Sequence, residues 1–338
     1  MKVSGLTNPI VAKELRSRMR TVRSPLAITG YVLVLGGLGW AAFANMAASA
    51  QGSFGQAATY GQNLFIFLVF VQLLVLTFLT PAFTAGAISG ERERQTIDLL
   101  FVTRLRPAAI LWGKLAASMS FVVLLLLLSV PLFSMVFLFG GIELDQVMTA
   151  FLVTAVTALT LGALGLFCST LTSRNLFATV SAYLAALLLV FGTVLWGALF
   201  PNEADPQSTS VTAPPTIVYL SPIPALAWVA GPGLGSGFGV RTVNSATITS
   251  TACSIGPDGV QTCTSNGGAV TRTRGLLAPV SPPPPGVIPS GPFAGWHYWQ
   301  ATVTLQLGLA LVALLVSTIL LPPVRRLPWR RAAVMGAR

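Results

Sequence analysis

Residues 62–88 read QNLFIFLVFVQLLVLTFLTPAFTAGAI, a run without a single charged side chain. An α-helix needs about 20 consecutive apolar residues to cross the hydrocarbon core of a bilayer. The run is long enough, so it predicts a transmembrane helix. The following residues 89–107, SGERERQTIDLLFVTRLRP, carry dense charge and mark the place where the chain leaves the membrane.

Similar apolar runs recur along the chain, which has 54% hydrophobic and only 9% charged residues among its 338. The mean hydropathy is +0.77, whereas a soluble domain carries charge on roughly a quarter of its residues. We therefore predict an all-α polytopic membrane protein. Its six expected transmembrane helices lie at about residues 26–46, 62–88, 108–138, 147–172, 175–200 and 299–321.

The basic residues indicate the topology. With six spans, all but three of the 20 lysines and arginines fall in segments on one side of the membrane, the exceptions being Arg241, Arg272 and Arg274. The positive-inside rule then places both termini in the cytoplasm. The net charge of +11 is accordingly read as a topology signal that also favours membrane lipid. We expect no nucleic acid, because interleaved aromatic residues are missing. The first apolar run is expected to remain as a span, not to be cleaved as a signal peptide.

The sequence lacks the groups that most active sites use. His297 is the only histidine, and no Gly-x-x-x-x-Gly-Lys-Ser/Thr string occurs. We count Lys114 with the cytoplasmic basic residues, so the interiors of the predicted spans hold no Asp, Glu, Lys or Arg. We expect no catalytic residue, no metal site and no cofactor bound by this chain. An ion-coupled transporter and an intramembrane enzyme are both disfavoured, since each usually needs an ionisable group in the membrane.

The N-terminal residues 1–25 predict an amphipathic helix on the cytoplasmic membrane surface. Val11, Leu15, Met19 and Val22 recur at helical spacing and form one apolar stripe. The polar face carries Lys13, Glu14, Arg16, Arg18 and Arg20, which is typical of an interfacial helix. A basic tail without structure is the alternative.

Residues 201–298 form a long external loop rich in Pro, Gly, Ser and Thr. Within this loop, the apolar segment 217–231 is too short and too interrupted by proline to span, so we expect it at the outer interface. Residues 243–273 alternate β-branched and polar types around the turn Gly256-Pro257-Asp258-Gly259, which predicts a β-hairpin. Cys253 and Cys263 lie five residues either side of Asp258, so they are expected to face each other and to form a disulfide outside the cell. Two free thiols are the alternative. The sixth span, 299–321, then leads to a basic cytoplasmic tail at 322–338.

The segment after residues 62–88 predicts a short cytoplasmic helix at about 91–103. Ile97, Leu100 and Phe101 have i, i+3, i+4 spacing and form an apolar face on a helix too short to be stable alone. Such a helix with charged flanks is typical of an element that docks into a groove. A solvated loop without a partner is the alternative.

Two stretches resemble a known family. NPIVAKELRSRMR at 8–20 resembles the opening helix of ABC transporter permeases of the type-two exporter class. GERERQTIDLLFVT at 90–103, with Gly113-Lys114-Leu115, resembles that family's signature between the second and third spans. Arg104-Leu105-Arg106-Pro107 departs from it, because relatives often have Pro soon after the Thr, and the external loop is not part of the family pattern.

The resemblance implies the permease subunit of an ATP-driven exporter in a prokaryotic plasma membrane. It implies two cytoplasmic ATP-binding-cassette subunits, which bind ATP and magnesium, and a second permease that is identical or homologous. The segment 91–103 would be the coupling helix that contacts the ATPase, the spans 26–200 and 299–321 would form half of the translocation path, and residues 8–23 would be the interfacial helix. The residues expected to bind the ATPase are Glu91, Arg92, Glu93, Arg94, Thr96, Ile97, Leu99 and Leu100. The alternative function is a non-transporting membrane scaffold or receptor whose cytoplasmic face recruits a partner.

Overall fold

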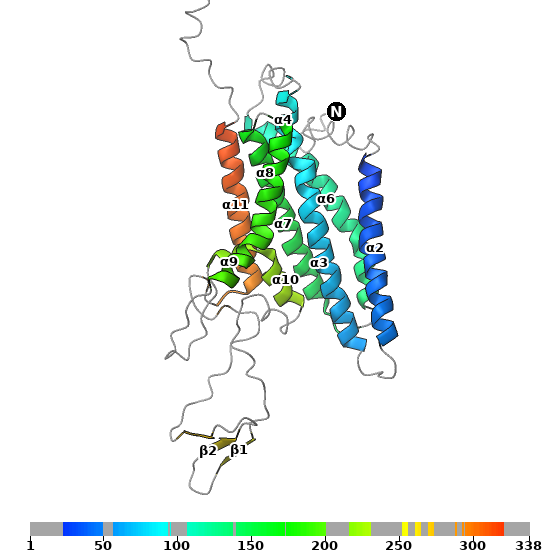
Figure 1. The fold of residues 1–338 in the computed structure, drawn as a ribbon, viewed down its shortest axis with the longest axis vertical. Coiled ribbons are helices and arrows are strands. Elements are labelled where there is room, and N and C mark those ends of the chain that lie inside the picture. The colour runs from blue at the N-terminus through cyan, green and yellow to red at the C-terminus, as the bar shows by residue number, and fades with distance from the viewer. Residues whose placement is uncertain are drawn as a thin grey trace, which may run out of the picture.

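The protein is almost entirely helical in the part that its computed structural model describes (Figure 1). The described residues are 23–49, 57–93, 95, 107–137, 140–172, 174–200, 216–230, 252–255, 261–264, 270–273, 288, 293 and 295–320. The predicted interfacial helix at 8–23 lies outside them. So do Arg94 and the segment 96–106.

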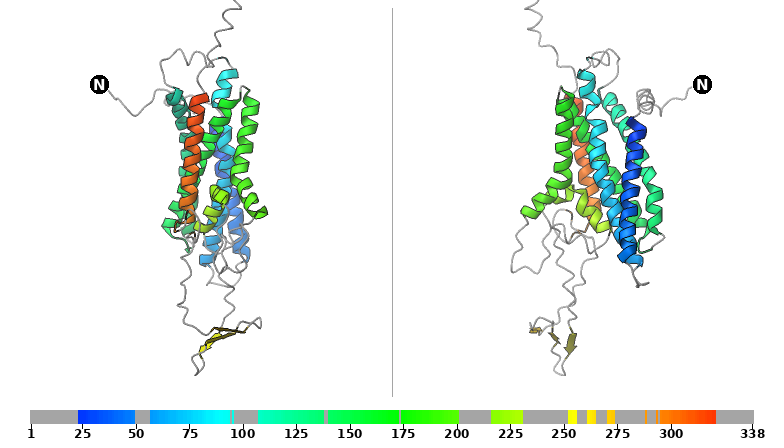
Figure 2. Two further views of the ribbon diagram at one scale, coloured as in Figure 1. Left: turned by 90° about the vertical axis from the view of Figure 1, so that its left-hand side faces the viewer. Right: turned by 45° about the vertical axis from the view of Figure 1, so that its right-hand side comes forward.

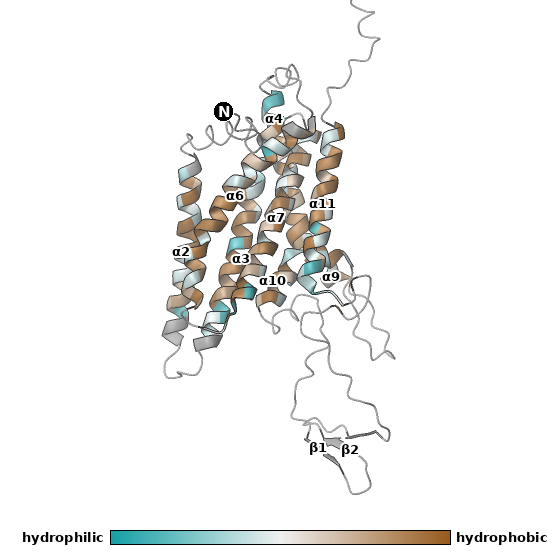
Figure 3. Cartoon of the chain, turned by 180° about the vertical axis from the view of Figure 1, so that it is seen from behind, coloured by the Kyte–Doolittle hydropathy of each residue, from teal (hydrophilic) through white to brown (hydrophobic). Residues whose placement is uncertain are grey.

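Six helices among the described residues are long and apolar enough to cross a membrane, which confirms the predicted number of spans. They are α2 (Arg23–Ser49), α3 (Ala57–Thr84) with its continuation α4 (Gly86–Glu93), α6 (Pro107–Phe137), α7 (Leu144–Leu171), the fifth span from α8 (Asn175–Leu187) to α9 (Thr193–Leu199), and α11 (Tyr298–Leu320). Hydrophobic residues predominate along these helices, and α4 is among the segments that carry hydrophilic residues (Figure 3).

Helix α7 lies at the centre of the bundle and packs against α3, α6, α8 and α11. Small residues allow this close approach. A Cβ at Gly165 would overlap the hydroxyl of Thr84 on α3, and a Cβ at Gly162 would overlap the end of Met119 on α6. Small residues at such positions let membrane helices pack through dispersion contacts in the absence of a hydrophobic driving force.

Two short helices between the fifth and sixth spans pack against the bundle, and most residues of the second one are buried. They are the 3-10 helix η3 (Thr216–Leu220) and the helix α10 (Pro222–Ala230). The sequence predicted that residues 217–231 are too short to span and lie at the outer interface. Instead, α10 packs against α3, α7 and α11, and Tyr219 is only 1% exposed. The apolar composition of the segment favours this position, because an interfacial location would leave much of its apolar surface in contact with headgroups and water.

The fifth span contains a π-helical turn, η2 (Leu188–Gly192), between α8 and α9. A π turn leaves the regular pattern of backbone hydrogen bonds, so local carbonyl groups become available to other donors. Ser221 Oγ donates to the carbonyl oxygen of Val190 at 2.8 Å. This bond joins the π turn to the start of α10.

Three short strands lie within the predicted loop 201–298. They are β1 (Ala252–Ile255), β2 (Gln261–Thr264) and β3 (Val270–Thr273), paired antiparallel in the order β1-β2-β3. The register places Cys253 opposite Cys263. The disulfide stays a prediction, because the side chains of these strands lie outside the described part of the chain.

Candidate functional site

The polar contacts of the described bundle concentrate where the second span breaks into two helices. Pro81 lies inside α3, and α3 ends at Thr84. Ala85 forms the turn, and its N–H donates to the carbonyl oxygen of Pro81 at 2.9 Å. The new helix α4 begins at Gly86. Each helix start exposes backbone N–H groups that have no partner within the helix, so α4 needs acceptors from elsewhere.

Ser169 on the central helix α7 supplies an acceptor. Its Oγ accepts the N–H groups of Ile88 at 3.0 Å and of Ser89 at 2.9 Å. It also donates to the Ser89 Oγ at 3.2 Å. A serine hydroxyl usually caps its own helix in this way. Here it caps another helix, so the start of α4 is fixed to α7.

Helix α8 reaches the same point with its first residue, Asn175. The Asn175 Oδ1 accepts a hydrogen bond from Ser89 Oγ at 3.3 Å. A Cβ at Gly86 would lie 2.9 Å from this oxygen, so the first residue of α4 has to be small where the two helices meet. The three helices α4, α7 and α8 therefore converge on Ser89.

The end of α4 is held to the end of α7 by Arg92. Its guanidinium Nη1 lies 3.3 Å from the carbonyl oxygen of Thr170 and 3.4 Å from that of Thr172. Carbonyl groups at a helix C-terminus lack partners within the helix and carry partial negative charge. The Arg92 guanidinium supplies these carbonyl groups with a hydrogen-bond donor and with a positive charge at the end of α7.

A salt bridge joins α4 to the third span. Lys114 Nζ lies 2.7 Å from Glu91 Oε1, and the side chains of Lys114 and Glu91 are 6% and 32% exposed. Lys114 belongs to α6 and is a buried residue of that span. The expectation that the spans hold no charged interior residue was therefore wrong at this position. Lys114 lies near the start of α6, where the carboxylate of Glu91 can reach it, and this pairing makes its burial tolerable.

Helix α4 ends in an unusual backbone conformation. Gln95 has a φ of 57°, and its N–H donates to the carbonyl oxygen of Arg92 at 3.2 Å. A left-handed residue after a helix redirects the chain and is usually glycine, because a side chain there is strained. The chain thus turns immediately before the segment 96–106.

We call the residues around α4 the α4 anchor, namely Ser89, Glu91, Arg92, Lys114, Ser169 and Asn175. Two of the predicted partner-binding residues, Glu91 and Arg92, belong to it. Glu93 is exposed beside it, whereas Arg94, Thr96, Ile97, Leu99 and Leu100 lie outside the described residues. Sequence reasoning missed Ser89, Ser169 and Asn175, since serine and asparagine in apolar runs carry no signal of their partners.

The α4 anchor is held together by hydrogen bonds and one ion pair. Within the described ranges, no group of His, Cys, Asp and Glu is placed to hold a metal ion. These contacts join α4 to the ends of α6, α7 and α8 that the sequence predicts to lie on the cytoplasmic side. A force applied to the chain beyond Gln95 would reach three spans through these contacts.

A second polar cluster fixes α11 to α7 deeper in the bundle. Gln306 on α11 is fully buried, and its Oε1 accepts from Thr157 Oγ1 at 3.0 Å while its Nε2 donates to the carbonyl oxygen of Leu220 at 3.0 Å. Thr160 Oγ1 donates to the carbonyl oxygen of Gln306 at 3.2 Å. These bonds tie the sixth span to the same central helix that the α4 anchor uses.

Comparison with known proteins identifies one family. The model of the family described as "ABC-2 family transporter protein" matches residues 28–229. The match covers five spans, the α4 anchor and the buried helix α10. No curated protein matches the chain.

Replacing Ser169 by alanine tests the capping of α4. The Ser169→Ala variant leaves two buried N–H groups without an acceptor, so we expect it to lower stability by about 1–3 kcal/mol. Ser317→Ala is the matched control, because the Ser317 hydroxyl is equally buried and donates to the Ala313 carbonyl of its own helix. Thermal unfolding in mild detergent measures both. Equal melting temperatures for the two variants would contradict the capping role.

The ion pair is tested by a double-mutant cycle. Glu91→Gln leaves the buried ammonium of Lys114 without its carboxylate and should cost about 2 kcal/mol or more. Adding Lys114→Met removes the stranded charge, so the double variant should be more stable than Glu91→Gln alone. Unfolding in detergent provides the readout. If the destabilisation of the double variant equals the sum of those of Glu91→Gln and Lys114→Met measured singly, the two side chains act independently and the ion pair is contradicted.

Proposed function

We propose, because the chain belongs to the ABC-2 transporter family and is a permease subunit of an ABC transporter, that it is an exporter permease. In this proposal it couples to a separate ATPase through residues 91–103. The family and the six spans make it a multi-pass membrane protein. The α4 anchor is the observation that carries the proposal. It fixes α4, whose last residues 91–93 begin the proposed coupling segment, to three spans.

The proposed mechanism is alternating access driven from outside the chain. ATP binding closes two cytoplasmic ATP-binding-cassette subunits and displaces the segment that contacts them. Because α4 is bonded to α6, α7 and α8, the displacement reaches the cytoplasmic ends of these spans together. The spans then rearrange around a path at the interface with a second permease, identical or homologous to this one.

The contacts of α4 divide the predicted partner-binding residues into two groups. Glu91 and Arg92 bind within the chain, to Lys114 and to the end of α7. We therefore propose that they act as positioning residues, while Arg94, Thr96, Ile97, Leu99 and Leu100 contact the ATPase. The exposed Glu93 lies at the boundary of the two groups.

The charged side chains of the bundle bear on the energy source of the proposed transport. Among the described residues, Lys114 is the charged side chain that the bundle buries, and it is paired near one end of its span. This placement does not favour a proton or cation relay across the membrane, which needs ionisable groups along the path. We propose that the chain has no enzymatic activity of its own and that ATP and magnesium bind in the partner subunit.

The topology completes the proposal. The basic flanks of the spans favour a cytoplasmic location for both termini and for α4. The loop 201–298, with its strands, is then external, and cargo leaves on that side of a prokaryotic plasma membrane. A cytoplasmic α4 is also what an intracellular ATPase requires.

A single charged substitution tests the proposed ATPase contact. Leu100→Asp places a carboxylate on the predicted apolar face and should weaken ATPase binding by about 2–4 kcal/mol. The partner to co-express is an ATPase with a Walker motif encoded next to this chain. Co-purification in mild detergent and ATPase activity in vesicles are the readouts, and both should fall while membrane insertion is unchanged.

Val102→Asp is the control for this experiment, since it adds the same charge at a neighbouring position outside the predicted contact set. It should leave binding and activity close to those of the unmodified chain. If Leu100→Asp retains full binding and coupled activity in vesicles, the proposed contact is wrong. If both variants lose the ATPase equally, the loss is a general effect of charge and the apolar contact is also unsupported.

A further inference from the structure

The first span is attached to the bundle along only part of its surface. Helix α2 packs against α3 and α6 and lies at the edge of the bundle (Figure 2). Tyr31 and Leu35 are buried at 2% and 0% exposure, whereas Leu33 and Trp40 are 68% and 67% exposed. Only one face of α2 therefore packs against the bundle.

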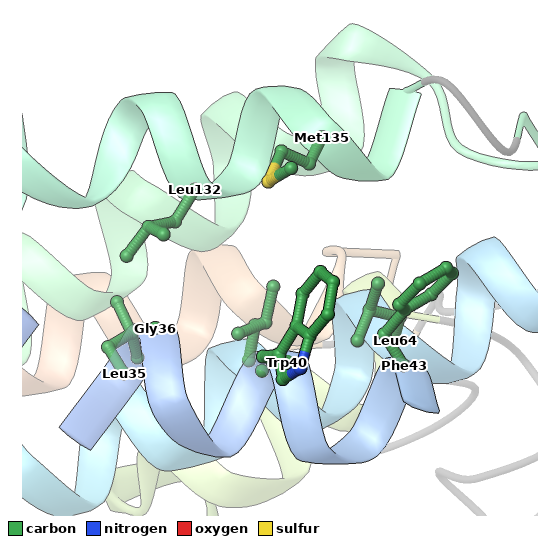
Figure 4. A pocket seen from close by; sticks show the side chains of 9 residues that line it. Leu35, Gly36, Trp40, Phe43, Leu64, Leu132 and Met135 are labelled. Atoms are coloured by element: carbon green, nitrogen blue, oxygen red, sulfur yellow. The ribbon is translucent and has the colours of Figure 1, made fainter. Parts of the chain in front are cut away.

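A cavity of about 130 Å³ lies between α2, α3 and α6. The side chains that line it project from all three helices, with Trp40 and Phe43 on one side and Leu132 and Met135 facing them (Figure 4). The complete lining is Leu35, Gly36, Gly39, Trp40, Phe43, Leu64, Leu68, Leu132 and Met135. Every one of these residues is apolar or glycine.

Two glycines of α2 keep this space open. A Cβ at Gly39 would lie 3.0 Å from the Cδ2 of Leu68, and a Cβ at Gly36 would lie 3.7 Å from the Cδ2 of Leu132. The intervening Gly37 is exposed and has no atom within 4 Å of its Cβ position. A larger side chain at Gly39 would therefore occupy the cavity, whereas one at Gly37 would point away from the bundle.

The cavity lies toward the end of the bundle opposite α4. Its residues Leu64 and Leu68 belong to the first half of α3, and α4 continues from the other end of that helix. Trp40 follows Arg23, the first residue of α2, by a helical length of about 26 Å, close to the roughly 30 Å thickness of the hydrocarbon core. With α4 in the cytoplasm, the cavity lies in the outer leaflet.

The chemistry of the lining selects the occupant. A space without polar partners does not hold ordered water, and an engineered apolar cavity of about 150 Å³ stays dry and takes up benzene. Around a membrane span, the apolar molecule present at the highest concentration is the lipid acyl chain. The exposed indole of Trp40 lies at the rim, as aromatic residues do near the membrane interface.

We propose that the cavity between α2, α3 and α6 binds an acyl chain of a bilayer lipid in the outer leaflet. The chain supplies dispersion contacts that α2 does not obtain from the bundle. Lipid thus becomes part of the packing of the first span. Binding of lipid rests on the walls of the cavity and not on the ATPase contact. The assignment to the outer leaflet rests on the proposed cytoplasmic location of α4.

Lipid photolabelling tests this site. The full-length chain is reconstituted in phosphatidylcholine vesicles that contain a phosphatidylcholine with an alkyl diazirine in one acyl chain, and adducts are mapped by mass spectrometry after irradiation. We expect adducts on Leu64 and Leu68, which are only 5% and 3% exposed and line the cavity. Leu125 and Leu161, at 0% and 1% exposure and outside the lining, should remain unlabelled.

Two glycine variants provide the matched comparison. Gly39→Leu fills the cavity and should abolish the adducts on Leu64 and Leu68, whereas Gly37→Leu should leave them unchanged. If Gly39→Leu does not fold, the labelling pattern of the unmodified chain alone decides whether lipid occupies the cavity. Adducts confined to Leu33 and other lipid-facing positions, with none on Leu64 and Leu68, would overturn the proposal.

Discussion

The structure depends on a rule that a bilayer enforces on any chain crossing it: a backbone N–H that lies in a buried place must find an acceptor. The second span is interrupted at Ala85, where α3 stops and α4 starts, and the N–H groups of Ile88 and Ser89 in the first turn of α4 find their acceptor outside this span. Ser169 supplies this acceptor from a different helix and accepts both N–H groups. Because the acceptor comes from α7, the position of α4 is set by the core of the bundle and not by the helix that precedes it.

The remaining contacts of α4 follow from this placement. Once its first turn lies against α7, Arg92 reaches the carbonyl groups at the end of α7, and Glu91 reaches Lys114 on α6. The polar bonds of Gln306 then connect α7 to α11. A displacement of α4 would therefore be transmitted to α7, at the centre of the bundle, through these hydrogen bonds and the salt bridge. Helix α2 does not share this network in the described residues, and most of the side chains through which it packs against α3 and α6 are apolar. Its packing leaves the apolar space that we assign to lipid.

The number and position of the spans were predictable from the sequence, because uncharged runs such as 62–88 have one stable solution in a membrane. The signature at 90–103 predicted the family, which the match to residues 28–229 confirms. The α4 anchor was not predictable, since it depends on which face of α7 carries Ser169 when the helices pack. The burial of Lys114 was not predictable either, because the sequence does not show that Glu91 pairs with it at the start of α6. The buried position of α10 likewise depends on tertiary packing, which its short, proline-containing sequence does not specify.

The central claim is that α4 and the adjoining ends of α6, α7 and α8 move as one body. Pulsed electron paramagnetic resonance measures this directly with spin labels at the exposed residues Glu93 on α4 and Leu176 on α8, in a chain whose native cysteines are replaced. A second pair, at Leu176 and at Leu33 on α2, reports whether the spans rearrange when the partner ATPase is trapped with nucleotide. The account predicts an unchanged Glu93–Leu176 distance under conditions that shift the second pair. A shift in the Glu93–Leu176 distance would contradict it.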